Sequence, residues 1–75
     1  MSHMPALKLP FAHEVLSAVF RLHDLGVVLC HLPDNSCTPY ATWRVDDHGN
    51  CYWGHYARAL DDARIHFMAR VLTIP

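Results

Sequence analysis

The sequence is poor in lysine and has no clustered charge. Lys8 is its only lysine, the arginines are scattered, and the formal net charge of the 75 residues is −1. Proteins that bind nucleic acid usually carry clustered basic residues, so a nucleic-acid partner is not expected. The absence of any acidic or basic run also excludes a charged tail and a basic patch for a membrane surface.

Long apolar stretches and a signal peptide are lacking as well. No apolar run approaches the roughly 20 residues of a transmembrane helix, and the N-terminus lacks a charged segment followed by an apolar one. Three cysteines cannot all pair in disulfides. We therefore expect a reduced, cytoplasmic protein without a membrane partner.

The chain is too short for two domains, which excludes an active-site cleft between domains. Ser2-His3-Met4 ahead of Pro5 has the form of a cloning remnant, so residues 1–4 are left out of the fold. Residues 5–75 are expected to form a single small domain. Such a chain buries only about 60% of its unfolded surface, so its core is small.

The N-terminal half of this domain is predicted to contain a helix and then a strand. Apolar residues recur with the helical period from Phe11 to Leu25, and Gly26 follows where a left-handed residue would end a helix. Residues 27–32 form a short β-branched and apolar run that predicts a strand.

A β-hairpin and a second helix are predicted in the remainder. The strands span 40–45 and 51–56 around a turn in which Gly49 supplies a positive φ. The favoured register places Val45 opposite Cys51, with the two tryptophans, 43 and 53, also opposite each other. The helix begins near Asp61, which is a favourable N-cap. Its apolar stripe contains residues 60, 63, 67 and 71, widened by residues 68 and 72.

These elements predict a compact α+β domain of order αβββα. Its three-stranded antiparallel sheet would have both helices packed on one face. The face that carries the tryptophans would meet the helices, and the face that carries the tyrosines would stay partly open.

The open face supplies the candidate binding surface. Tyrosine and arginine are enriched at protein interfaces because they combine large contact area with a polar group. Arg64 joins this set because it interrupts the apolar stripe of the second helix. Two alternatives remain: cross-strand pairs that only stabilise the sheet, and stacking of single-stranded bases. The candidate residues are Tyr40, Thr42, Arg44, Tyr52, Tyr56 and Arg64.

Cysteine and histidine provide a second candidate site, for zinc. Several lie within a short stretch with spacings that suit zinc ligands, although no Cys-x2–4-Cys knuckle is present. Buried core cysteines and solvated histidines account for the same residues, so no cofactor is expected unless zinc binds. The candidate ligands are Cys30, Cys37, His48, Cys51 and His55.

Catalytic motifs are lacking. The sequence has no nucleophile elbow, no phosphate-binding glycine loop and no His-Glu-x-x-His. Cys37 lies in a polar loop and is the one cysteine expected to be exposed, so an enzyme that depends on its thiol is a further alternative. The prediction is therefore a small non-enzymatic protein-interaction module, a homodimer, of the kind found as accessory proteins of bacterial, phage or mobile-element genomes. A zinc module and a single-strand nucleic-acid binder are the alternatives.

Overall fold

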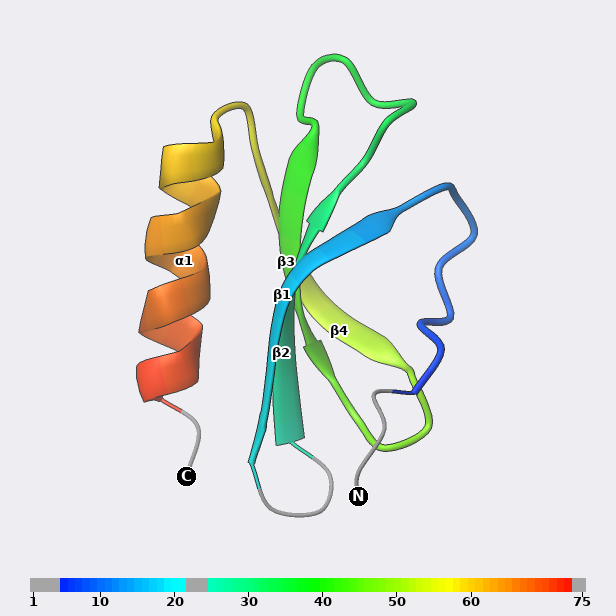
Figure 1. Ribbon diagram of the computed structural model, residues 1–75, viewed down its shortest axis with the longest axis vertical. Coiled ribbons are helices and arrows are strands. Elements are labelled where there is room, and N and C mark those ends of the chain that lie inside the picture. The colour runs from blue at the N-terminus through cyan, green and yellow to red at the C-terminus, as the bar shows by residue number, and fades with distance from the viewer. Residues whose placement is uncertain (1–4, 22–24, 74–75) are drawn as a thin grey trace.

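One inner strand of the sheet is buried on both of its faces, and this determines the layers of the molecule. β2 (Leu25–His31) has five consecutive buried residues, 26–30. Successive strand residues point to opposite faces, so each face needs its own cover. In the computed structural model, which describes residues 5–21 and 25–73, α1 (Leu60–Leu72) covers one face and the N-terminal segment 5–11 covers the other (Figure 1).

The sheet is a four-stranded antiparallel meander. β1 (Glu14–Arg21), β2, β3 (Tyr40–Val45) and β4 (Cys51–Ala57) lie side by side in sequence order. β1 and β4 are therefore the two edge strands. Within the described residues, no helix is long and apolar enough to cross a membrane.

Each face of the sheet has its own hydrophobic core. On the helix face, Ala63, Phe67 and Val71 of α1 pack on the sheet together with Val27 and Leu29. On the opposite face, Leu7 and Leu9 of the N-terminal segment pack against a cluster that consists of Val28, Cys30, Leu32, Ala41, Trp43 and Val45.

The N-terminal segment is held against the β3–β4 turn by its backbone. The amide of Lys8 donates a hydrogen bond to the carbonyl oxygen of Gly49 at 2.9 Å. Gly49 has φ +88°, and a Cβ built there would lie 2.0 Å from the carbonyl oxygen of Ala6. Glycine is therefore required at this position by both the turn and the contact.

The turn itself is organised by Asp46. Its carboxylate accepts hydrogen bonds from the side chain and backbone amide of Asn50, the Tyr52 hydroxyl and the His48 amide, all at 2.9 Å. These bonds, the Asn50 side chain foremost, hold the pKa of Asp46 well below its usual range. The predicted turn and the pairing of Val45 with Cys51 are confirmed.

The prediction of a helix from Phe11 to Leu25 is wrong. Residues 14–21 form β1, and Gly26 is a strand residue paired with Phe20; Leu22, His23 and Asp24 lie outside the described residues. The apolar side chains of β1 divide between the faces: Val19 packs on the helix face, and Val15 and Phe20 on the other. A helix would have left one edge of β2 without a hydrogen-bonding partner.

The predicted αβββα order is corrected accordingly. The chain has the order ββββα, with four strands in place of three and a single described helix in place of two. It is still an α+β domain. α1 covers the face that carries Tyr40 and Thr42, whereas the prediction placed the helices on the face of Trp43.

A β-bulge explains why the two tryptophans do not pair. Arg44 lies opposite Tyr52 and Thr42 lies opposite His55, so Trp53 and Gly54 together face one residue of β3. Trp53 has φ +52°. The bulge reverses the alternation of β4, which neither composition nor spacing indicates.

The second helix is confirmed with corrected ends and a narrower buried stripe. Its N-cap is Ala59, without a side-chain hydrogen bond, and not Asp61. The predicted residues 60, 63, 67 and 71 do pack on the sheet, whereas Met68 and Leu72 are exposed.

We expect Gly49→Ala to lower the free energy of unfolding by about 1–3 kcal/mol, because the new Cβ occupies a left-handed position and collides with Ala6. His48→Ala, one residue earlier in the same turn and exposed, is the control, with a change within about 0.5 kcal/mol. Urea unfolding measures both, and equal stability of the two variants would contradict the close contact.

Candidate functional site

The six predicted binding residues do not form one surface. Thr42 has no exposed area, and Tyr40 packs against the helix-face core. Tyr52 and Tyr56 are exposed, but the bulge between them places them on opposite faces of the sheet. Arg64 is exposed on α1. Two separate surfaces and one pocket take the place of the predicted face.

The first surface is centred on Trp53, which was predicted to lie in the core. Its side chain is 73% exposed. The guanidinium of Arg44 lies 5.6 Å from the centre of the indole ring, and Arg70 of α1 donates a hydrogen bond to the Trp53 carbonyl oxygen. Burial, and then the proximity of Arg44, lowers the pKa of Arg70. The two arginines thus fix a bulky residue in a backbone conformation that it rarely adopts.

The second surface is an apolar stripe on α1. Ile65, Met68 and Leu72 recur at helical spacing and are 54–76% exposed. On the helix, Arg70 and His66 are turned toward β4, where they contact Trp53 and His55. The helical period turns Ile65 and Leu72 away from the sheet, and Ile65 also borders a hollow beside β4.

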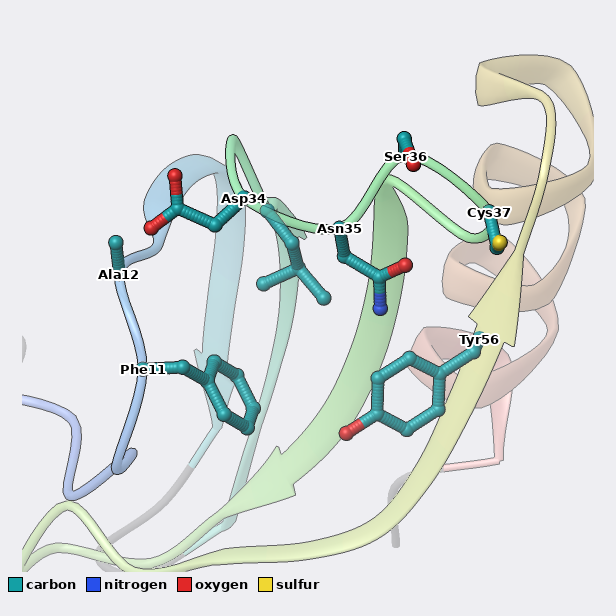
Figure 2. Close-up of a pocket in the computed structure, with 8 residues that line it drawn as sticks. Phe11, Ala12, Asp34, Asn35, Ser36, Cys37 and Tyr56 are labelled. Atoms are coloured by element: carbon teal, nitrogen blue, oxygen red, sulfur yellow. The ribbon is translucent and has the colours of Figure 1, made fainter.

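The pocket has a volume of about 360 Å³ and lies between the N-terminal segment, the β2–β3 loop and β4. Figure 2 shows the rings of Phe11 and Tyr56 on two sides of the space, with the Asn35 amide between them. Leu32 also lines it, and Asp34, Ser36 and Cys37 lie around the opening.

The orientation of the Asn35 amide follows from one hydrogen bond. Its Oδ1 accepts from the backbone amide of Thr38 at 3.0 Å, and an N–H can donate only to the oxygen of that side chain. The Nδ2 group is therefore the end left for the pocket. None of the described residues accepts a hydrogen bond from this group.

The ring of Trp43 contacts both aromatic walls of the pocket. Its ring centre lies 6.1 Å from that of Phe11, and 5.7 Å from that of Tyr56 in an edge-on arrangement. Trp43 is buried, and a Cβ on Gly54 would lie 2.5 Å from its indole nitrogen. The walls thus rest on a packed ring, which fits a pocket that exists before its ligand binds.

The candidate zinc ligands are not gathered at one point. Cys30 is buried and Cys51 half-buried in the core beneath the N-terminal segment, Cys37 is exposed in the loop, and His48 is exposed in the turn. His55 lies on the helix face. No group of three or more His, Cys, Asp or Glu that suits a metal occurs among the described residues.

Burial governs the chemistry of the two inner thiols. It raises the pKa of Cys30 to about 12, with a smaller contribution from Cys51, and it also raises the pKa of Cys51. Thiols are nucleophiles and metal ligands only as thiolates. Neither cysteine is therefore prepared for that chemistry near neutral pH.

A pair of stacked histidines joins α1 to β4. The rings of His55 and His66 are 3.4 Å apart and nearly parallel. Burial, then His66 and Arg70, lowers the pKa of His55. No feature of the sequence pairs these two residues, because they lie on elements that meet only in the folded chain.

Comparison with protein-family models, with curated protein sequences and with solved structures gave no match. The arguments about function therefore rest on the geometry of this chain.

The histidine stack makes stability depend on pH. The unfolded chain takes up a proton on His55 as the pH falls through about 6.5, whereas the folded chain resists it, so the unfolded state binds more protons below that pH. We expect the thermal unfolding midpoint to decrease as the pH is lowered from 7.5 to 5.5. In His55→Gln this decrease is expected to be smaller. His48→Gln is the control and should retain it. An unchanged pH dependence in His55→Gln would contradict this role.

Proposed function

We propose that this chain is a small protein-interaction module that forms a homodimer through its edge strand β1. Two copies of β1 pair antiparallel about a two-fold axis, which joins the two sheets into one. The proposal is carried by the complementary charges at the two ends of that strand.

β1 is the edge strand that suits pairing with another chain. β4, the other edge, is interrupted in its middle by the bulge at Trp53, whereas the bulge of β1 lies near its start and leaves Ser17 to Arg21 regular. α1 packs mainly over β2, β3 and β4, and Val19 is the residue of β1 that joins the helix-face core. Edge strands that do not pair are commonly protected by proline, charged side chains, bulges or a covering element. β1 has a bulge and charges near its ends, but the stretch from Ser17 to Phe20 has no proline, charge or bulge.

The charges of β1 lie at its ends. Glu14 and Arg21 both belong to the helix face, because their partners His31 and Leu25 lie on that face next to Tyr40 and the core. The register of β1 shifts between Val15 and Ser17.

This shift is a β-bulge whose extra residue is Leu16. When two copies of β1 pair about a two-fold axis at Ala18, Glu14 lies opposite Arg21 of the partner subunit at both ends of the pair. The same register places Val15 opposite Phe20 of the partner subunit. The charged pairs at the ends and the apolar Val15–Phe20 pairs next to them favour this register over its neighbours.

The exposed apolar side chains of α1 support a protein-interaction role, but they do not mark where the second copy lies. Met68 lies on the flank of α1 away from β4, whereas Ile65 lines a hollow with His55 and Arg58 beside β4. Exposed apolar side chains that gather on one side of a small protein commonly mark an interaction surface. Arg64 lies on the same flank of α1 as Met68.

Arg21→Glu tests the proposal directly. It places like charges opposite each other at both ends of the pair, and two such contacts weaken dimerisation about tenfold or more. The double variant Glu14→Arg/Arg21→Glu exchanges the two charges and is expected to restore dimerisation in part, because it also removes the 2.6 Å contact between Glu14 and His31 within the chain. Sedimentation at micromolar concentrations measures the dissociation constants.

Arg58→Glu is the matched control, because it changes the net charge equally at an exposed residue after β4. It is expected to dimerise as the unaltered chain does. An unaltered chain that sediments as a monomer at about 100 µM, or a dimer that is indifferent to Arg21→Glu, would overturn the proposal.

A further inference from the structure

We infer that the pocket between Phe11, Asn35 and Tyr56 binds a proline-containing segment of an extended peptide. This site lies on a different surface from the β1 edge, so it adds a heterologous partner to the proposed homodimer. Either surface can fail without the other.

The walls of the pocket suit a proline ring. Phe11 and Tyr56 present aromatic surface, each partly exposed, and Leu32 is the apolar residue between the loop and the sheet. Aromatic grooves bind proline-rich segments because the polyproline helix is already extended before binding, so little conformational entropy is lost. A volume of about 360 Å³ is near the lower end for ligand sites, which fits one or two side chains rather than a large cofactor.

The polar groups of the pocket are hydrogen-bond donors, which favours a partner with hydrogen-bond acceptors. The Asn35 Nδ2 group carries two donor hydrogens, and the Tyr56 hydroxyl carries a third. A peptide carbonyl satisfies such donors. Proline has a carbonyl but no backbone N–H, so it brings no donor of its own that would need an acceptor within the pocket.

The charge at the opening selects the flanking residue. Asp34 is the one charged side chain among the residues that line the pocket, and it lies beside Ala12 in Figure 2. A phosphate backbone would be repelled there, whereas an arginine or lysine next to the proline would be attracted. This favours a peptide over a single-stranded nucleic acid.

The test uses fluorescence polarisation of labelled ten-residue peptides with the full chain. The first peptide contains two consecutive prolines followed by arginine, in the second both prolines are alanine, and in the third the arginine is glutamate. We expect each change to weaken binding about tenfold. A labelled ten-nucleotide thymidine strand is the fourth probe, and no binding is expected.

The matched variant is Asn35→Asp. It keeps the oxygen that accepts from Thr38, so the loop is retained, but it replaces both donor hydrogens by an acceptor. We expect at least a tenfold loss of affinity for a peptide in which alanine replaces the arginine of the first peptide, so that the added negative charge does not offset the lost donors. Tyr56→Phe removes one donor and keeps the ring, so a smaller loss is expected. His48→Ala, in the β3–β4 turn outside the pocket lining, is the control and should bind normally.

Equal binding of the proline and alanine peptides would overturn the inference. So would full affinity of both Asn35→Asp and Tyr56→Phe, or tighter binding of the thymidine strand than of the first peptide. Arg21→Glu, which addresses the dimer, lies outside the pocket lining and is expected to bind the peptide as the unaltered chain does.

Discussion

The fold depends on the burial of β2 on both of its faces. Residues 26–30 alternate between the faces and are all buried, so a helix on one side alone would leave half of them in water. α1 covers one face and the N-terminal segment covers the other. Fully burying each valine or leucine contributes about 1.5–3 kcal/mol, which makes the second cover as necessary as the first in so short a chain.

That second cover also creates the pocket. The segment that places Leu7 and Leu9 on the sheet continues into Phe11, which forms one wall. Its attachment at Gly49 is a backbone contact that only glycine permits. The N-terminal segment therefore both covers the second hydrophobic core and forms one wall of the candidate binding site. On the helix face, α1 packs mainly over β2, β3 and β4, and the outer hydrogen-bonding edge of β1 has no neighbouring strand among the described residues.

The sequence predicted the local elements better than their assembly. The run of residues 27–32, the turn at Gly49 and the C-terminal helix each carry a local signal, and all three are present. β1 was mistaken for a helix because Val15, Ala18 and Val19 fit the helical period as well as they fit a strand with apolar residues on both faces. Local periodicity cannot distinguish a helix from such a strand. The strand forms because the edge of β2 needs a hydrogen-bonding partner, which is a requirement of the assembled sheet.

The candidate site was harder to predict, for the same reason. The bulge at Trp53 moves Tyr56 to the other face and turns a predicted core tryptophan outward. The pocket joins residues 11, 35 and 56, which no spacing relates. One residue of the pocket was predicted correctly: the polar loop around Cys37 indicated that this cysteine is exposed, and this is confirmed.

The central claim about function is that β1 pairs with a second copy of itself. Hydrogen exchange of the β1 amides, measured above and below the dissociation constant, tests it most directly. Pairing predicts that every second amide from Ser17 to Arg21 exchanges more slowly at the higher concentration, while the amides of β4 are unchanged. Exchange in β1 that is the same at both concentrations would contradict it.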